Sequence, residues 1–470
     1  MEHGDGERAA KRAEPSASAT ADGGGEEDLL SALPDDVLLH ILARLRSAAF
    51  AARTSALSSR WRRLWALLPT LEFCPLDVYR IGPALAAHEA EARATLLCLR
   101  VFLWEANAAS VAAWIPAAAR RLSGSLTLVN SVDDWEADGG VFELPCFENA
   151  TSIRLGLGFL GIAVPASGIS ARLTDLHMDT FQKTPVCSVR LSPRRTARRC
   201  EGSLSGTPGG IDRFTMHSES LLQLKLCDLE DFEQLTLVTP ALRELHVSGC
   251  FGQFMNPARL VVSISAPELA LLEWKDAYDP SSVQLGEMPN LQRLCPGTFL
   301  VYGPNDFVPN RNVLRLLGHF RVMHSVALKL FCRPDISHRQ YLMESMARLP
   351  GNITNLFLDV VSNGHSIGAI SFHILRVSTD VRSLTINLIQ GGAPPTHCTP
   401  GCICDRSQKW KTEELALNHL RQVEILGLTG TEHELAFLEQ FFSRATVLKV
   451  MRISINDAIP DLRAACCSTY

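Results

Sequence analysis

One short apolar pattern recurs along most of this chain and limits what it can fold into. The pattern L-x-x-L-x-L, with Ile, Val, Met or Trp in some positions, marks a short strand followed by a turn back through irregular or helical chain. One copy has too little surface to be stable alone, so neighbouring copies must stack. Seven copies begin at Leu173, Leu221, Leu242, Leu269, Ile353, Val381 and Leu420.

The spacing of these copies is typical of leucine-rich repeats. The best-spaced starts, at residues 221, 242, 269 and 291, are separated by 21, 27 and 22 residues. Irregular spacing elsewhere indicates insertions or degenerate copies. Stacked repeats of this kind predict a curved solenoid, which offers a long surface to a protein partner.

Composition and charge exclude other classes. The chain has 470 residues, too many for one ordinary core, so several domains or one extended array are expected. Hydrophobic residues make up 46% and charged residues 20%, as in globular proteins. The net charge of -5 gives no support to binding of nucleic acid or of a membrane surface.

The beginning of the chain and its cysteines indicate a compartment. Residues 1–28 are rich in Gly, Ala and acidic residues, so we expect a disordered tail and not a signal peptide. No apolar run is long enough to cross a bilayer. We therefore expect a cytoplasmic or nuclear protein whose fourteen cysteines stay reduced.

The segment after this tail has the spacing of short helices. Pro34 suits a first helical position, and the acidic residues after it favour the positive end of a helix dipole. One apolar helical face follows, and two further helical stretches are expected from about Ala48 to Leu57 and from Ser58 to Trp65. Three short helices bury only a small core, so an exposed apolar remainder would seek a partner.

This segment resembles the F-box, a three-helix module. The resemblance rests on the start Leu33-Pro34-Asp35-Asp36-Val37-Leu38 and on the end Leu57-Ser58-Ser59-Arg60-Trp61-Arg62-Arg63-Leu64-Trp65. In that family the module docks on the Skp-type adaptor of a cullin–RING ubiquitin ligase. The alternative is that the apolar stripe is only the core of a helical domain. The resemblance implies adaptor-binding or core positions for Leu33, Pro34, Val37, Leu38, Ile41, Leu42, Leu45, Leu57, Trp61, Leu64 and Trp65.

The C-terminal part resembles the FBD region, which follows the repeats in many plant F-box proteins. The similar stretches include 420–425, 430–438 and 445–451. Their pattern predicts a strand, a short turn, an amphipathic helix from Glu432 to Arg444 and a closing strand from Leu448 to Ile455. Such a unit would suit a cap on the open end of a solenoid.

The sequence therefore predicts an α/β protein with an N-terminal three-helix F-box, an irregular leucine-rich-repeat solenoid and a C-terminal FBD-like cap. The expected boundaries are a tail at 1–28, the F-box at 29–75, the repeats at 76–390, a Cys/Pro-rich loop at 391–410 and the FBD-like region at 411–470. The stretch 190–210 holds five arginines within ten residues and interrupts the repeats. We interpret it as a solvated loop between repeats, in preference to a nucleic-acid patch.

Two motifs that are typical of enzymes are interpreted as chance matches. Gly364-His365-Ser366-Ile367-Gly368 fits the G-x-S-x-G nucleophile elbow between an expected strand and an expected helix, but no oxyanion segment precedes it. Gly156 to Gly161 fits G-x-G-x-x-G, but Pro165 and the lack of a helical pattern spoil the helix that a dinucleotide site needs.

A cluster of potential zinc ligands lies near the C-terminus. His397, Cys398, Cys402 and Cys404 fall within eight residues, and zinc favours thiolate and imidazole. The C-x-C spacing lacks the usual two to four intervening residues, and no second pair follows. We therefore expect a loop with reduced thiols, and no metal or cofactor.

These patterns predict a non-catalytic protein. In the preferred hypothesis it is the substrate-recognition subunit of an SCF-type cullin–RING ubiquitin ligase, in which the F-box binds the Skp-type adaptor and the repeats bind a target protein of unknown identity. The alternative is a leucine-rich-repeat interaction scaffold with no role in a ubiquitin ligase.

Overall fold

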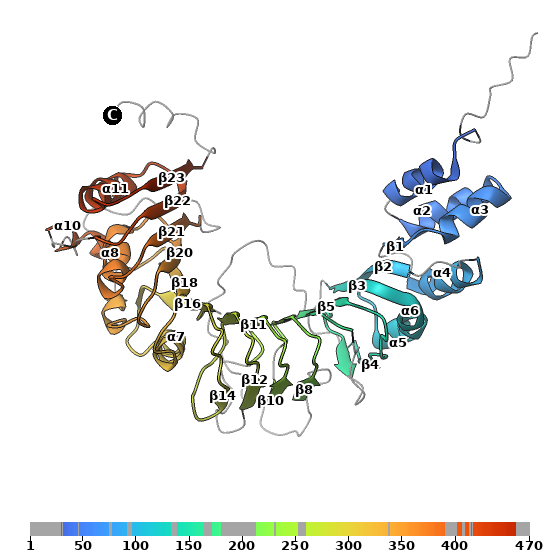
Figure 1. Cartoon of the computed structure of the whole chain (residues 1–470), viewed down its shortest axis with the longest axis horizontal. Coiled ribbons are helices and arrows are strands. Elements are labelled where there is room, and N and C mark those ends of the chain that lie inside the picture. Colours follow the sequence, from blue (N-terminus) through green and yellow to red (C-terminus); the bar gives the residue numbers. More distant parts are fainter. Residues whose placement is uncertain are drawn as a thin grey trace, which may run out of the picture.

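In the computed structural model the chain forms an arc, with three helices at its N-terminal end and the last described strand at the other (Figure 1). The structure describes residues 30–456 except 31, 46, 75–77, 92–95, 133–138, 164–171, 180–212, 230–231, 252–259, 337–338, 391–401, 407–408, 413–414 and 416. The expected tail at 1–28 and the arginine-rich stretch at 190–210 therefore lie outside the described residues. A mixed α/β fold, helical first and then rich in strands, is confirmed.

A single parallel sheet runs along the whole arc. Its strands lie side by side in the order in which they occur in the chain, and every pair along this path is parallel. The path is β1 (Thr70–Phe73), β2 (Leu96–Trp104), β3 (Leu122–Ser131), β5 (Ser152–Gly156), β7 (Asp175–Asp179), β9 (Gln223–Cys227), β11 (Glu244–Ser248), β13 (Leu271–Trp274), β15 (Arg293–Cys295), β18 (Ser325–Phe331), β20 (Asn355–Val361), β21 (Ser383–Leu388), β22 (Gln422–Leu428) and β23 (Val450–Ile455), with β16 (Thr298–Leu300) also paired to β18.

The register of this sheet brings one apolar position of every strand into a single row. Except at the last strand, the residues of this row are buried, and each is paired in register with the row residue of the strand before and of the strand after. All seven predicted copies of the pattern form strands of this sheet. The inward row is Leu71, Leu99, Leu126, Ile153, Leu176, Leu224, Leu245, Leu272, Leu294, Val326, Leu356, Leu384, Val423 and Met451.

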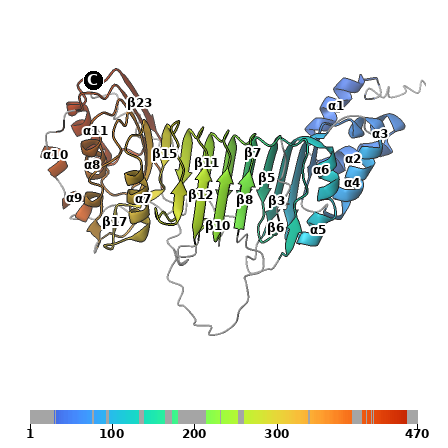
Figure 2. The same ribbon diagram turned by 60° about the horizontal axis from the view of Figure 1, so that its bottom comes forward.

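The convex side of the arc is built differently at its ends and in its middle (Figures 1 and 2). Helices cover it towards the N-terminus, namely α4 (Val78–Glu91), α5 (Ala108–Ala112) and α6 (Ile115–Arg121). Others cover it towards the C-terminus: α7 (Val308–His319), α8 (Gly368–Val377), α9 (Ile403–Arg406), α10 (Lys409–Thr412) and α11 (Glu432–Arg444).

In the middle of the arc a second parallel sheet replaces the helices. It has the order β14 (Val283–Leu285), β12 (Val261–Ser265), β10 (Gln234–Val238), β8 (Arg213–His217). Leu224, Leu245, Leu272 and Leu294 of the inward row are only 21, 27 and 22 residues apart here. Such short returns favour an extended strand, because a strand covers a given distance with fewer residues than a helix. Two further pairs are parallel β4 (Val141–Glu143) with β6 (Gly161–Ala163) and antiparallel β17 (Tyr302–Gly303) with β19 (Gln340–Tyr341).

Aromatic rings fill the space between the two sheets. Phe214, Phe232, Phe251 and Trp274 follow one another at centroid distances of 6.1, 6.1 and 5.6 Å. Trp274 is fully buried, and its indole nitrogen donates to the carbonyl of Ala277 at 3.1 Å. Rings in such contact add to the stability that their burial supplies.

The C-terminal elements have the predicted order of strand, helix and strand. Thr431 begins α11 in a capping box: its hydroxyl accepts from the amide of Glu434, and the Glu434 carboxylate accepts from the amides of Thr431 and Gly430. The role of a cap is not shown by these elements. Met451 and Ile453 of β23 continue the inward rows but stay 39% and 40% exposed, so β23 alone does not close the core.

A buried amide ties three successive layers together near the N-terminal end. Asn130 is fully buried; its side-chain oxygen accepts from the Ala106 amide at 3.0 Å, and its nitrogen donates to the carbonyls of Ala106 (3.1 Å) and Leu157 (3.5 Å). These bonds satisfy backbone groups that lie in turns and therefore have no partner in a neighbouring strand. Asn130 therefore holds the turns of adjacent layers in register.

We predict that Asn130→Ala lowers the free energy of unfolding by about 1–3 kcal/mol, because it leaves a buried amide without an acceptor. Urea denaturation of the full chain, followed by circular dichroism, measures the change. The matched control is Asn387→Ala, which removes only an exposed bond of 3.1 Å to Asp359. We expect that control to cost less than about 0.5 kcal/mol. Equal losses in the two variants would contradict the role given to Asn130.

Candidate protein-binding surfaces

The N-terminal helices α1 (Asp35–Arg44), α2 (Ala48–Arg53) and α3 (Ser59–Ala66), with the 3-10 turn η1 (Thr54–Ala56), pack around a small core. Both tryptophans of α3 lie in it, and Ser58 begins that helix by accepting a bond from the Trp61 amide at 3.4 Å. Of the eleven apolar residues singled out in the sequence, the buried ones are Leu38, Leu42, Trp61, Leu64 and Trp65. These five residues are core positions in the structure.

The other members of that set lie at the surface. Val37, Ile41 and Leu45 are 39%, 37% and 40% exposed, and their spacing of four residues makes one stripe along α1. Leu57 is 65% exposed, Pro34 is exposed and Leu33 is half-buried. Helix α1 thus has two apolar stripes, one turned into the domain and one turned to solvent.

Polar bonds fix α3 against the beginning of α1. The Arg60 guanidinium pairs with the Asp35 carboxylate at 2.6 Å and also donates to the Leu33 carbonyl at 2.5 Å. The Leu33-Pro34-Asp35 start and the Arg60-Trp61 sequence are therefore in contact. This contact sets the orientation of the exposed stripe on α1.

The comparisons with known proteins identify this helical unit. Residues 30–72 match the F-box domain. The chain contains an F-box domain. The match ends within β1, so the F-box runs directly into the first strand of the sheet.

The chain also has relatives in Arabidopsis thaliana. One, named as an F-box/LRR-repeat protein, is 25% identical over an alignment of 476 positions, which covers 93% of this chain and 94% of the relative. An FBD-associated F-box protein is 27% identical over 268 residues, covering 52% of this chain but only 58% of the relative. An F-box/FBD/LRR-repeat protein is 54% identical over 50 residues, 11% of each chain. Similarity to the last relative is thus high but confined to a short stretch.

The F-box is packed firmly on the first layer of the sheet. His88 of α4 is buried; its ring lies 5.7 Å from that of Trp65, and its Nε2 is 3.2 Å from the Leu68 carbonyl oxygen. Burial lowers the pKa of His88, so the ring is neutral at pH 7. A neutral ring is a suitable filler between two apolar layers. The F-box and the repeats therefore form one continuous body here.

The concave face of the long sheet is the second candidate surface. No described helix lies over this face (Figure 1). Along each strand, the residues next to the inward row face this side of the sheet and form a ladder across the strands, because successive side chains of a strand alternate between its two faces. Charged members of this ladder pair across strands, such as Arg100 of β2 with Glu72 of β1 at 3.6 Å and Arg154 of β5 with Asp179 of β7 at 3.9 Å. A shallow hollow of about 660 Å³ lies over β1, β2, β3 and β5, and it is lined by Glu72, Arg100, Phe102, Thr127, Val129, Ser131 and Arg154.

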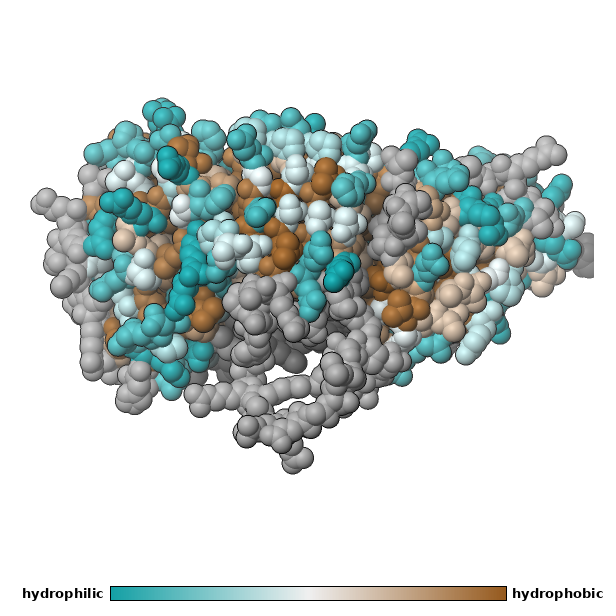
Figure 3. All heavy atoms as spheres, turned by 90° about the horizontal axis from the view of Figure 1, so that it is seen from below, coloured by the Kyte–Doolittle hydropathy of each residue, from teal (hydrophilic) through white to brown (hydrophobic). Residues whose placement is uncertain are grey.

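The convex face carries both apolar and hydrophilic side chains. Seen from below, apolar patches alternate with hydrophilic side chains over it (Figure 3). Val141 and Val261, on convex strands, are 59% and 54% exposed. In the part of the chain that the structure describes, no helix is long and apolar enough to span a membrane.

Near the middle of the arc, the carboxyl groups of Glu273 and Asp276 have pKa values shifted in opposite directions. His246 lies 2.8 Å from the Glu273 carboxylate and Lys275 also pairs with it, and together they lower the pKa of Glu273 to about 2. Burial raises the pKa of Asp276 to about 6, although the amides of Cys250 and Phe251 donate to its carboxylate. The two carboxyl groups therefore change charge in different pH ranges.

The motifs that are typical of enzymes lack the geometry of an active site. Ser366 does lie between a strand and a helix, β20 and α8, but it is only 3% exposed. The neighbouring His365 directs Nε2 at two backbone carbonyls and Nδ1 at Cys402. After Gly156 the chain turns into strand β6 at Gly161, so no helix begins at the glycine-rich turn. The second motif thus lies in a turn between two strands.

The predicted Cys/His loop is described only in part. His397 and Cys398 lie outside the described residues. Cys402 and Cys404 lie at the beginning of α9, and the structure brings them next to His365. Sequence spacing did not connect His365 with these cysteines, because 37 residues separate it from Cys402.

We predict that Glu273→Gln lowers the free energy of unfolding by about 1–2 kcal/mol at pH 7, a value reduced for partial solvent screening. The folded-state pKa of Glu273 lies below its unfolded value of 4.5, so this contribution is present above pH 4.5 and is lost as the pH falls towards 2. Melting temperatures of both proteins between pH 3 and pH 7 measure the difference.

The comparison of wild type with Glu273→Gln isolates this group from Asp276. The raised pKa of Asp276 acts in the opposite direction, because its stabilising neutral form is lost as the pH rises from 3.8 through about 6. Both proteins contain Asp276, so its effect cancels in the difference. A difference that stayed constant over the whole range would contradict the prediction.

Proposed function

We propose that this chain is the substrate-recognition subunit of an SCF-type cullin–RING ubiquitin ligase. In this proposal the F-box binds a Skp-type adaptor, and the concave face of the repeats binds a target protein. The observation that carries the proposal is the stripe of Val37, Ile41 and Leu45 on the outer side of α1 in a domain that matches the F-box. F-box domains generally bind Skp-type adaptors.

The exposed apolar surface of the F-box supports a protein partner. Single exposed apolar residues are common on soluble proteins, but a contiguous group indicates an interaction site. Beyond the α1 stripe, Phe50 and Leu57 are 55% and 65% exposed in the same small domain. A helix that offers residues at i, i+4 and i+8 suits docking against an apolar groove or helix face.

The strand-rich region supports the second half of the proposal. We interpret residues 76–390 as an irregular leucine-rich-repeat solenoid and residues 411–470 as an FBD-like unit that ends it. Because the adaptor site and the array belong to one body, a target on the concave face would be held at a fixed place relative to the ligase. Tethering raises the effective concentration of target lysines near the charged ubiquitin carrier.

No residue of this chain needs to take part in the chemistry of ubiquitin transfer under this proposal. F-box/LRR family proteins are generally non-catalytic adaptors, and Ser366 has no access to a substrate in the structure. The proposal also includes a cytoplasmic or nuclear location, where the reduced state of the cysteines would be kept.

We predict that Val37→Asp combined with Ile41→Asp weakens binding of the full chain to a purified plant Skp-type adaptor at least about 100-fold, or about 2.7 kcal/mol. Burying two carboxylates in an apolar interface is costly, while in the free protein both side chains stay in water. Isothermal titration calorimetry measures the affinity, and circular dichroism checks that the fold is kept. Leu38 is unsuitable for this test, because it is fully buried and its replacement by Asp would unfold the domain.

The matched control is Val308→Asp combined with Val322→Asp. These valines are 54% and 55% exposed and lie far along the chain, at α7 and before β18. We expect the control to bind the adaptor within twofold of wild type. Equal affinities for the two double variants would contradict the proposed docking surface. A folded wild-type chain that bound no adaptor would leave a leucine-rich-repeat scaffold without a ligase role.

A further inference from the structure

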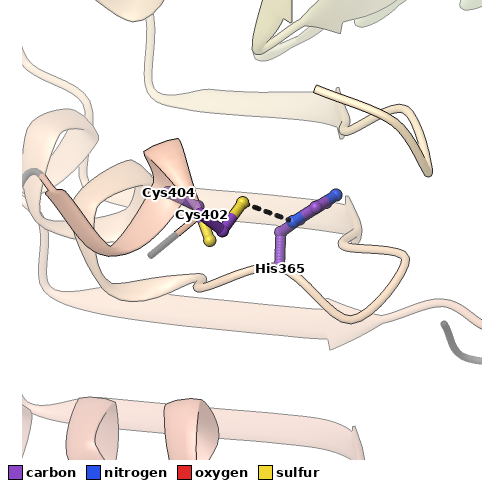
Figure 4. Close-up of side chains that lie close together, drawn as sticks. All are labelled: His365, Cys402 and Cys404. Atoms are coloured by element: carbon purple, nitrogen blue, oxygen red, sulfur yellow. Dashed lines mark hydrogen bonds between the residues drawn. The ribbon is translucent and has the colours of Figure 1, made fainter. Parts of the chain in front are cut away.

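A histidine and two cysteines from distant parts of the chain meet on the convex side near the C-terminal end. His365 is 7% exposed, Cys404 is fully buried and Cys402 is half-buried. One nitrogen or sulfur atom from each lies within 4.8 Å of the other two, and Cys402 Sγ is 3.6 Å from His365 Nδ1 (Figure 4). The three side chains converge on one point between two segments.

The turn after β20 holds His365 in a fixed position. Asn363 and Gly364 have positive φ angles of 48° and 85°, which reverse the chain sharply before the histidine. The Asn363 side chain donates to the Cys332 carbonyl at 2.7 Å and so ties the turn to the preceding layer. The imidazole is therefore placed by the backbone of two adjacent layers.

Hydrogen bonds also decide which nitrogen of His365 faces the cysteines as an acceptor. Nε2 is 3.1 Å from the carbonyl oxygens of both Arg333 and Pro334. A carbonyl oxygen can only accept, so Nε2 carries the proton and Nδ1 presents its lone pair to Cys402. In metal sites the ligating histidine almost always donates its other N–H to a carbonyl or carboxylate in this way.

We propose that His365 Nδ1, Cys402 Sγ and Cys404 Sγ bind one Zn²⁺ ion, with a water molecule as the fourth ligand. Zn–S distances near 2.3 Å and Zn–N distances near 2.0 Å place tetrahedral ligand atoms about 3.3–3.8 Å apart. The separation of 3.6 Å between Cys402 and His365 already fits this range. The widest separation in the cluster needs a closure of only about 1 Å.

The chemistry of the donors favours zinc over hard cations. Two sulfur ligands and one imidazole suit Zn²⁺, whereas Mg²⁺ and Ca²⁺ require oxygen ligands. The site does not use His397 or Cys398. Its histidine comes from the β20–α8 turn, which no pattern along the sequence connects with the C-x-C pair.

The ion would fasten the insertion between β21 and β22 to the layer of α8. In the described part of this insertion, Trp410 follows the two cysteines and packs on Phe372 of α8 at a centroid distance of 5.4 Å. Gly368 is required beneath Trp410, because a Cβ there would come within 2.4 Å of the indole ring. Zinc and Trp410 would hold the segment from Cys402 to Trp410 against α8 at two points, and so would stabilise the C-terminal layers.

The first test measures metal in the purified full chain, kept with a reductant that does not bind metal. We expect about one zinc per chain by inductively coupled plasma mass spectrometry. Replacement by Co²⁺ should give visible bands of tetrahedral cobalt and near-ultraviolet charge-transfer bands of thiolate ligation. A folded wild-type chain that takes up neither ion would overturn the proposal, as would octahedral cobalt without thiolate bands.

The second test uses variants with matched controls. Cys402→Ser with Cys404→Ser, and separately His365→Gln, should weaken Zn²⁺ binding at least about 100-fold and abolish the rise in melting temperature on adding Zn²⁺. The controls are Cys250→Ser and His373→Gln. Cys250 is another buried cysteine, and His373 is another buried histidine whose Nε2 lies 3.1 Å from a backbone carbonyl.

The controls should bind zinc as wild type does. Unchanged affinity in the double cysteine variant would place the ion elsewhere and overturn the proposal. If the variants fail to fold, the cobalt spectrum of the wild-type chain still decides the matter, since thiolate bands need no variant. None of these measurements involves the adaptor, so the zinc site stands or fails independently of the proposed function.

Discussion

The structure depends on the parallel register of its long sheet. Most neighbouring strands share only two to five paired residues, which is too few for a strand pair to be stable alone. Each strand is therefore held in place by the layers on both of its sides. Strands β7 and β9 show how strongly this register acts. Leu176 and Leu224 are 48 residues apart in sequence and yet pair directly, although β8 of the second sheet lies between them in the chain. The fold thus requires that successive strands pair in register, and it does not fix the length of chain between them.

A stack of layers has two ends, and both leave apolar surface uncovered. At the N-terminal end the F-box covers β1 and turns Val37, Ile41 and Leu45 outward. At the C-terminal end, Met451 and Ile453 remain about two-fifths exposed on β23. The first surface lies on a regular helix in a domain with known relatives, which is why it supports a proposed partner. For the second, nothing in the described residues shows what covers it.

The sequence predicted the strands well where the pattern was strict and poorly elsewhere. The pattern at Leu68, Leu71 and Phe73 also matches the repeat, as does that at Leu96, Leu99 and Val101, but variable spacing and the helical segments between them hid these copies. Around Ile153 the first position is Ala150, and a search for large apolar residues misses it. In the F-box both stripes of α1 are apolar, so spacing alone could not separate core from surface. The packing of α1 on α3 decides this, and these two helices are separated in the sequence by α2.

Spacing along the sequence also could not reveal the cluster of His365 with Cys402 and Cys404, because its contacts are long-range as well. The stacking of layers explains where such clusters can form. In a stacked array, residues at equivalent places in successive returns become neighbours however far apart they are in sequence. Insertions can vary freely as long as they return to the stack, so they can bring new side chains to an existing turn. The turn after β20 is rigid because two layers hold it, and the inserted C-x-C pair needs only to reach it. In this chain, short-range motifs such as G-x-S-x-G therefore say little about which side chains meet, whereas the order of the layers says much.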